Sequence, residues 1–252
     1  MYRFVFLIVT SFVFLTCKGT EKKEINASSI ISELKKGNHI HYHDKIIVDD
    51  LNFSTVSEPF LMSAAAFQQE IKSNIFFSDC IFLGKVSSNG KKDKMSIKSR
   101  FNNNVIFINC DFRDEVDFSE AIFYGLLNFS KSKFSENATF DAMTVWSKDA
   151  YFSEMKAEKR FSMVYSLFAD NLYFISASFA DRVSFQETTV NGKFMCNNCI
   201  FKNRAEFDLM KINGKAFFNY AAFEDRANFL GIRKLEEIDF INTKFKHDPI
   251  FE

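Results

Sequence analysis

The 252-residue sequence has no net charge, with 32 Lys and Arg against 32 Asp and Glu. This balance argues against a general nucleic-acid binder, which would be basic. The sequence contains no GxGxxG, P-loop, HExxH or GxSxG motif, so common nucleotide-binding, metallopeptidase and serine-hydrolase signatures are missing. Proline (2), tryptophan (1) and cysteine (5) are scarce, whereas phenylalanine occurs 34 times. Because ordinary cores mix Leu, Ile, Val and Phe, this excess indicates that particular positions select Phe.

The composition is that of a globular protein. Charged residues make up 25% of the chain and the mean hydropathy is −0.12, which describes neither a disordered nor a polytopic chain. The one long apolar run, residues 4–15, is too short to span a bilayer and has the length of a signal-peptide core.

Residues 1–17 are interpreted as an export signal. Thr16 and Cys17 follow the apolar run, and a Cys at this place resembles the lipobox of bacterial lipoproteins, in which that Cys is lipidated. Leu15 stands one place late and Thr16 is bulkier than usual, so ordinary secretory cleavage is the alternative. We expect lipidation at Cys17 and a polar tether over residues 18–27. The expected location is the bacterial cell envelope, as an outer-membrane lipoprotein that is periplasmic or surface-exposed.

Phenylalanines recur through the body of the chain at steps that alternate between five and six residues. A helix would give steps of three and four, so the pattern does not predict an amphipathic helix. An inward small residue two places before each Phe is strand-like, and the regular break forces a turn. Short strands that turn in one sense form a four-sided solenoid, whose coils must stack to bury the rings. The clearest run is Phe107, Phe112, Phe118, Phe123, Phe129, Phe134 and Phe140.

This pattern resembles the pentapeptide-repeat family, whose motif is a small residue, a polar residue, a central Leu or Phe and two polar residues. Residues 121–125 (AIFYG) and 221–225 (AAFED) show it, and the likeness covers about residues 40–251. The extra residue in every second unit makes this a Phe-centred variant with an eleven-residue pair. The resemblance implies an all-β, right-handed quadrilateral parallel β-helix with coils of about twenty-two residues. Two buried columns are then predicted: Phe107, Phe129, Phe152, Phe174, Cys196, Phe218 and Phe240, and Phe112, Phe134, Ala157, Phe179, Phe201, Phe223 and Phe245.

The ends and interruptions follow from the same argument. Residues 28–39 are predicted to form a capping helix with a serine N-cap and a stop at Gly37, ahead of a solenoid over 40–252. Insertions are expected at about 54–73, as a helical excursion, and at 85–100, as a loop pushed out of the rod. No helix follows Phe251, so the last coil is blunted by Pro249 or covered by an end-to-end homodimer.

Three histidines alternate at the start of the solenoid. His39, His41 and His43 would share one outward strand face, where imidazoles can chelate Zn or Cu. No cysteine or clear set of carboxylates joins them, so a solvated face is the favoured interpretation, and no metal or other cofactor is expected.

Four cysteines fall on inward positions of the repeat. Cys196 and Cys199 form a CxxC, but Cys196 takes a central position and Cys199 the small position of the next unit, which favours buried structural thiols over a redox site. Cys80 and Cys110 also take small positions. Whether they form a disulfide depends on the register across residues 85–100, which the sequence leaves open.

One outward column is unusually apolar. Tyr151, Tyr173, Met195 and Phe217 each stand one residue before a central position, and the neighbouring outward column adds Ile108, Ile175 and Ile241. An exposed apolar strip of this kind is uncommon on a monomer and predicts a binding face for a sugar, a peptide or a partner protein. The alternative is an aromatic ladder that only stabilises strand stacking.

The leading functional hypothesis is a non-enzymatic, envelope-anchored repeat scaffold, held to the membrane by its lipid and bound to a protein, peptide or glycan partner. The resemblance also raises DNA mimicry against topoisomerases, which needs dense negative charge. Residues 101–252 carry only 18 Lys and Arg against 22 Asp and Glu, so nucleic-acid mimicry and nucleic-acid partners are not favoured. An envelope carbohydrate-active enzyme on a β-helix is a further alternative, for which no acid–base pair stands out and no catalytic residue is assigned.

Overall fold

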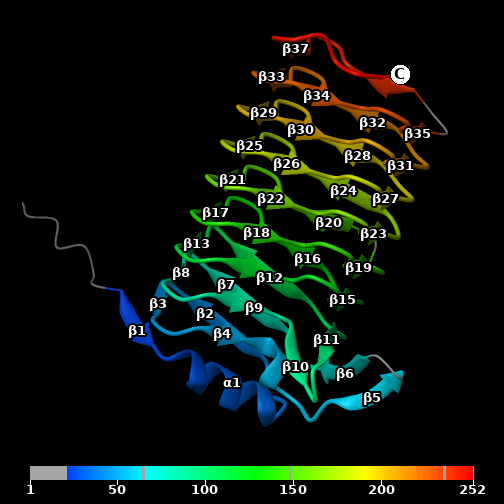
Figure 1. Ribbon diagram of the computed structural model, residues 1–252. Coiled ribbons are helices and arrows are strands. Elements are labelled where there is room, and N and C mark those ends of the chain that lie inside the picture. Colours follow the sequence, from blue (N-terminus) through cyan, green and yellow to red (C-terminus); the bar gives the residue numbers. More distant parts are fainter. Residues whose placement is uncertain (1–21, 64–65, 148, 235–236, 252) are drawn as a thin grey trace, which may run out of the picture.

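The chain folds into a four-sided parallel β-helix. The computed structural model describes residues 22–63, 66–147, 149–234 and 237–251, and the strands stack in successive coils from the N-terminal to the C-terminal end (Figure 1). Each coil passes through four sheets, which we name B, A, C and D in chain order. Sheets B and C therefore lie on opposite sides of the coil. The predicted pentapeptide-repeat solenoid is confirmed.

Sheets B and A hold the first two sides of each coil. Sheet B contains β2 (Ile40–His43), β7 (Ile75–Ser78), β12 (Val105–Ile108), β16 (Leu127–Asn128), β20 (Asp149–Tyr151), β24 (Asn171–Tyr173), β28 (Phe194–Met195), β32 (Ala216–Phe217) and β36 (Ile238–Asp239). Sheet A contains β1 (Lys23–Ile25), β3 (Lys45–Ile47), β8 (Ile81–Phe82), β13 (Asp111–Phe112), β17 (Lys133–Phe134), β21 (Lys156–Ala157), β25 (Ser178–Phe179), β29 (Ile200–Phe201), β33 (Ala222–Phe223) and β37 (Lys244–Phe245).

Sheets C and D complete the coil. Sheet C contains β4 (Leu51–Asn52), β9 (Val86–Ser87), β14 (Val116–Asp117), β18 (Ala138–Thr139), β22 (Phe161–Ser162), β26 (Val183–Ser184), β30 (Ala205–Glu206) and β34 (Ala227–Asn228). Sheet D contains β5 (Phe60–Ser63), β6 (Ala66–Ile71), β10 (Gly90–Lys92), β11 (Met95–Phe101), β15 (Ile122–Phe123), β19 (Thr144–Val145), β23 (Leu167–Phe168), β27 (Thr189–Val190), β31 (Lys211–Ile212) and β35 (Arg233–Lys234). A 3₁₀ turn, η1 (Phe53–Thr55), follows β4.

The register places the phenylalanines in the predicted columns. Val105 pairs with Leu127 and Phe112 with Phe134, a step of twenty-two residues. In the first column the rings of Phe107 and Phe129 lie 5.0 Å apart and nearly parallel. Rings in different columns meet edge to face, as Phe129 and Phe140 do at 5.3 Å. Both arrangements suit the quadrupole of an aromatic ring, so the core combines burial with favourable ring geometry.

Two kinds of corner explain the alternation of five and six residues. The five-residue corners, between sheets B and A and between sheets C and D, each place a residue in the left-handed region, for example Asn109 at φ 54° and Glu120 at φ 59°. The six-residue corners use the extra residue instead and need no such conformation. Tyr220 and Leu209 also adopt positive φ, although bulky residues disfavour it. Coil geometry therefore overrides local preference at these corners.

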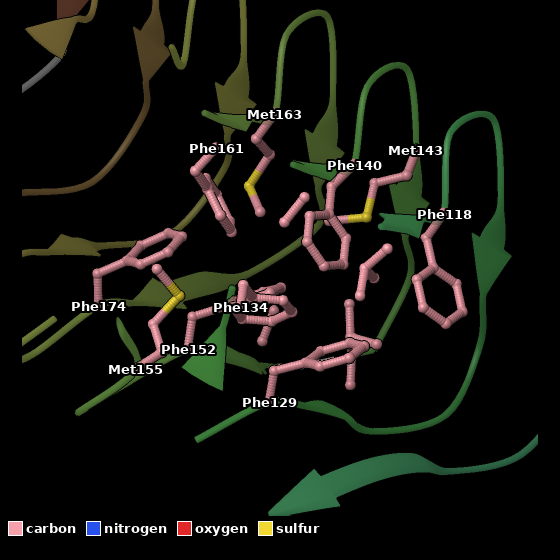
Figure 2. Close-up of a cluster of buried hydrophobic side chains, with 14 of the residues drawn as sticks. Phe118, Phe129, Phe134, Phe140, Met143, Phe152, Met155, Phe161, Met163 and Phe174 are labelled. Atoms are coloured by element: carbon pink, nitrogen blue, oxygen red, sulfur yellow. The ribbon is translucent and has the colours of Figure 1, made fainter. Parts of the chain in front are cut away.

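Large and small side chains exchange places where a column lacks its Phe. Ala157 stands at a central position, and Phe161, at a small position on β22, contacts the neighbouring rings Phe134 and Phe179 at 6.2 and 5.5 Å. Figure 2 shows Phe161 directed into the cluster beside Met163. Because interiors are close-packed, the larger residue fills the volume that Ala157 leaves.

Buried hydroxyl groups occupy several small positions without remaining unpaired. Each donates a hydrogen bond to a main-chain carbonyl of a central Phe on the preceding coil. Buried hydroxyls need such a partner, because an unsatisfied polar group in the core is costly. The bonds are Ser132 Oγ to Phe107 O (2.9 Å) and Ser166 Oγ to Phe140 O (2.7 Å), and the half-buried Thr243 makes the same bond from Oγ1 to Phe218 O (2.7 Å).

The N-terminal cap differs in detail from the prediction. Helix α1 spans Ala27–Lys35 and buries Ala27, Ile30 and Leu34 at the blue end of the rod (Figure 1). Its N-cap is Asn26, without a side-chain capping bond, so the predicted serine cap is wrong. The helix stops before the predicted residue 39, and Gly37 follows at φ +81°, which agrees with the predicted stop.

The expected tether is partly structured. Residues 23–25 form β1, which pairs in parallel with β3 and extends sheet A by one strand. The tether prediction is therefore wrong for these residues, because the unpaired edge of β3 offers them hydrogen bonds. The signal over residues 1–17, Cys17 and residues 18–21 lie outside the described residues. Within the described part of the chain, no helix has the length and apolar character needed to cross a membrane.

The two predicted insertions are hairpins rather than a helix and a free loop. β5 pairs antiparallel with β6, and β10 pairs antiparallel with β11. β6 and β11 then pair in parallel over six residues, so both insertions lengthen sheet D at the N-terminal end. The helical excursion at 54–73 is wrong because strand pairing with the neighbouring insertion satisfies the backbone there.

The C-terminal coil continues the solenoid to its last described residue. Asn228 forms a parallel bridge with Ile250, and the Phe251 ring stacks on Phe229 at 5.2 Å. Ile250 and Phe251 remain 42% and 45% exposed. This end of the rod therefore presents apolar surface to solvent.

Candidate functional site

The outward apolar column forms a contiguous strip on sheet B. We call Tyr151, Tyr173, Met195 and Phe217 the aromatic strip. Strand register brings each residue directly beside the next on β20, β24, β28 and β32. All four side chains are half-buried, because neighbours on adjacent coils cover part of each. The predicted column is therefore present, but it is less exposed than an isolated surface ring would be.

Ring stacking and hydrogen bonds order the N-terminal half of the strip. The rings of Tyr151 and Tyr173 lie 5.0 Å apart at an interplanar angle of 7°. The Tyr151 hydroxyl donates to Asp149 Oδ2 (2.9 Å), and Asn171 Nδ2 donates to Asp149 Oδ1 (2.7 Å). The strip therefore offers two fixed, parallel rings that are stacked on each other, with a carboxylate at their edge.

These contacts hold both phenols neutral. Partial burial, then the hydrogen bond to Asp149, raises the pKa of Tyr151 to about 12. Burial and the nearby carboxylate of Asp149 also raise the pKa of Tyr173. The Tyr151 hydroxyl already donates to Asp149, so it can only accept a further hydrogen bond, whereas the neutral Tyr173 hydroxyl can donate or accept.

The neighbouring column does not widen the strip. Ile108, Ile175 and Ile241 lie in one column of turn residues, but Ser130 and Ser153 separate Ile108 from Ile175. Asn197 and Asn219 likewise stand before Ile241. The expectation of a two-column apolar face is wrong, because the three isoleucines are not on adjacent coils. The strip ends at Asn128 on one side and at Asp239 on the other.

The three histidines share an exposed face but have separate partners. His39 Nδ1 accepts the Asn74 N–H (2.9 Å), and the His41 ring packs on Phe76 at 4.6 Å. His43 Nδ1 lies 2.9 Å from Ser78 Oγ and 3.2 Å from Asp79. Across the described ranges, no three His, Cys, Asp or Glu side chains are grouped so as to hold a metal ion.

The CxxC cysteines are joined. Cys196 and Cys199 form a disulfide across the corner from sheet B to sheet A, with their Cα atoms 5.4 Å apart. The prediction of two buried thiols is right about burial and wrong about the thiols. The CxxC spacing alone could not predict the disulfide. The bond forms because the corner between sheets B and A brings the central position of Cys196 close to the small position of Cys199.

The other two cysteines stand on neighbouring coils, where Asp111 N donates to Cys80 O (2.9 Å). Both are buried free thiols. Burial raises the pKa of each thiol. They are therefore poor nucleophiles, since the thiolate is the reactive form.

Sequence reasoning missed a column of four arginines at the corner where the chain enters sheet C. We call Arg160, Arg182, Arg204 and Arg226 the arginine ladder. All four are exposed and stand on successive coils. Their spacing of twenty-two residues was a visible signal, but the coil period was applied to apolar columns only. Among the described residues, the only fully buried carboxylate is Glu206, which pairs with Arg182 and Arg204.

Comparison with known proteins supports the architecture. Residues 97–144 match the family model for Pentapeptide repeats (9 copies), a segment that runs through β11 to β19. No curated protein and no solved structure gave a match. The coils on both sides of the segment keep the same four-sheet path and register. Residues 97–144 are thus pentapeptide repeats, and the fold of the described chain is the pentapeptide-repeat β-helix.

Proposed function

We propose that this chain is a non-catalytic repeat scaffold of the bacterial envelope that binds a protein, peptide or glycan partner through the aromatic strip. The observation that carries the proposal is the in-register stack of Tyr151, Tyr173, Met195 and Phe217 on one face. Ordered aromatic side chains contact sugars and apolar side chains at little cost in conformational entropy. The rigid β-helix beneath holds them in place before a ligand arrives.

The proposed anchor is the lipid on Cys17. Five residues separate Cys17 from Lys23, where β1 begins, and the six residue steps of an extended chain reach about 20 Å. A lipidated Cys17 would therefore hold the N-terminal end of the rod near the membrane. Metabolic labelling with a fatty acid, with Cys17→Ala as control, tests the anchor. Protease treatment of intact cells then distinguishes surface display from a periplasmic location.

The binding face is tested by site-specific photocrosslinking in cells. A crosslinking residue at position 217 should give adducts that the Tyr151→Ser/Tyr173→Ser variant loses. The matched control is Tyr165→Ser/Tyr220→Ser, which removes two more exposed tyrosines from corners outside the strip. If the strip variant keeps every adduct, the strip is only a stacking ladder and the proposal is wrong.

We also propose that a second copy of the chain covers the C-terminal coil. Its support is the exposed apolar surface of Ile250 and Phe251, together with the edges of the last strands, on which no further strand pairs among the described residues. A two-fold axis at this end would pair identical patches, as closed dimers require. The bound partner of the strip and the second copy would occupy different parts of the rod.

A further inference from the structure

We propose that the arginine ladder binds a linear acidic polysaccharide that lies along the rod at the corner between sheets A and C. The aromatic strip lies on sheet B, which is opposite sheet C, because each coil visits the sheets in the order B, A, C and D. The inference does not depend on the strip, on the lipid anchor or on the second copy. It concerns a different set of residues and a ligand of defined charge.

The backbone fixes the spacing of the ladder. Each arginine carbonyl accepts a hydrogen bond from the preceding coil: Phe161 N to Arg182 O (3.1 Å), Val183 N to Arg204 O (3.1 Å) and Ala205 N to Arg226 O (3.0 Å). Neighbouring strands lie about 4.8 Å apart, so four rungs place positive charges along about 14 Å of one edge. A row of like charges at this spacing repels itself unless anions lie beside it.

The chain supplies only part of that compensation. Glu206 accepts Arg182 Nε at 2.9 Å and lies 3.0 Å from Arg204 Nε, with its own side chain 6% exposed. In the described part of the structure, the side chains of Arg160 and Arg226 have no hydrogen bond or ion pair. One carboxylate thus serves the two middle arginines, and the two outer guanidinium groups keep all their donors for a ligand.

Two nearby carboxylates are already occupied. Asp181 Oδ1 accepts the Arg182 main-chain N–H at 2.7 Å, and Asp225 Oδ1 accepts the Arg226 main-chain N–H at 2.8 Å. Asp181 also accepts Asn203 Nδ2 at 3.1 Å. One oxygen of each carboxylate is therefore engaged at the corner, and the charge of both lowers the net potential of this edge. A ligand must then engage several arginines at once to bind well.

The outward positions of sheet C beside the ladder are polar, and a polar cavity that includes Glu115, Asp117 and Asp141 adjoins Arg160. Ser162 and Ser184 occupy the outward positions next to Arg160 and Arg182, and both are buried. Beyond them the outward positions are Glu206 and Asn228. Because these positions are mostly covered, the exposed guanidinium groups form the contact surface. They suit a chain that carries a carboxylate on each unit, since arginine binds carboxylates with two donors.

Other polyanions fit this face less well. Single-stranded nucleic acid is held by aromatic stacking, and these outward positions of sheet C carry no aromatic residue. An extended acidic peptide repeats its side chains on one face about every 6.6 Å, against about 4.8 Å between rungs. Sheet C also offers such a peptide no free strand edge along its length. A polysaccharide with an acid group on each sugar meets the ladder without those requirements.

The test uses the full chain and polygalacturonate, a linear polymer of uronic acid, in affinity electrophoresis. We expect retardation that falls as NaCl is raised, because exposed charges are screened. Arg160→Gln/Arg226→Gln should weaken binding about tenfold, from a few-fold per exposed charge contact. These two side chains have no partner in the described structure, so the variant should keep the wild-type circular dichroism and melting curve.

The matched control is Lys156→Gln/Lys211→Gln, which removes the same charge from exposed positions on sheets A and D. It should bind polygalacturonate like the wild type. Equal weakening by both variants would mean diffuse attraction, and no wild-type binding would also overturn the proposal. Tighter binding of a single-stranded oligonucleotide or of anionic phospholipid vesicles than of polygalacturonate would overturn the choice of ligand.

Discussion

Phe194 and Cys196 exchange the sizes that the repeat assigns to their positions on one coil. Phe194 stands where Leu172 and Ala216 stand on the coils beside it, and its ring lies 5.5 Å from Phe218. Cys196 stands in the column of Phe174 and Phe218 and is fully buried. The volume of the coil is conserved although neither position follows the repeat, and the same exchange links Ala157 and Phe161.

The exchange of Ala157 and Phe161 can be tested by a double-mutant cycle. Phe161→Ala should lower the free energy of unfolding by about 3–5 kcal/mol through the cavity it leaves. Ala157→Phe should cost about 1–3 kcal/mol through overpacking. In the double variant each change relieves the other, so urea unfolding followed by circular dichroism should show a loss well below the sum. Simple additivity would mean that the two positions do not share one space.

Reduction of the Cys196–Cys199 disulfide should destabilise the rod modestly. The bond closes a very short loop, so its loss should cost about 2 kcal/mol. The measurement is the unfolding midpoint with and without a phosphine reductant. The variant Cys196→Val/Cys199→Thr should unfold at the same midpoint in both conditions, because it has no disulfide to reduce. Val and Thr are chosen because Val190 and Thr243 already occupy a central and a small position of the repeat. A wild-type midpoint that ignores the reductant would contradict the prediction.

Tyr151 should titrate well above a free tyrosine. Burial, supported by the Asp149 hydrogen bond, raises the pKa of Tyr151 from 10.0 to about 12. Its contribution to stability is therefore complete below pH 10 and is lost as the pH rises from 10 through 12. Ultraviolet difference titration of wild type against Tyr151→Phe isolates this phenol. Asp149→Asn should lower the pKa of Tyr151 only partly, since burial remains, and an ordinary value in the wild type would contradict the described contacts.

The C-terminal end should control self-association. Phe251→Asp replaces the exposed ring that stacks on Phe229 with a charged side chain. It should convert a dimer into a monomer in sedimentation velocity. Phe60→Asp is the matched control, because Phe60 is 50% exposed on β5 at the opposite end of the rod. A wild-type chain that sediments as a monomer at all concentrations would exclude the proposed second copy.

The sequence was sufficient for the core columns because their signal repeats many times. Phe107 and Phe129 are stacked as predicted, and so are Phe112 and Phe134. The same position recurs in every coil, so one ambiguous residue does not change the inferred register. The twenty-two-residue period therefore predicts the strand register without any knowledge of the turns. The aromatic strip was found in the same way.

Features that occur once were not accessible in this way. The β5–β6 and β10–β11 hairpins stabilise each other through the parallel pairing of β6 with β11, for example Phe67 with Ile97. No local sequence pattern predicts this pairing. The left-handed corners were hidden for a different reason. They include Glu120 and Tyr220, where coil closure rather than residue preference sets the backbone.

Because the two kinds of corner recur in every coil, the length of the rod can change only in steps of one coil. Every coil returns to the same four sides. Removing twenty-two residues would therefore shorten the molecule by one step of about 4.8 Å and leave all side-chain columns in register. A single added residue is accommodated between Val145 and Phe152, where the register advances by twenty-three. A gene that duplicates or loses whole coils can therefore change how far the two ends stand apart without redesigning the interior.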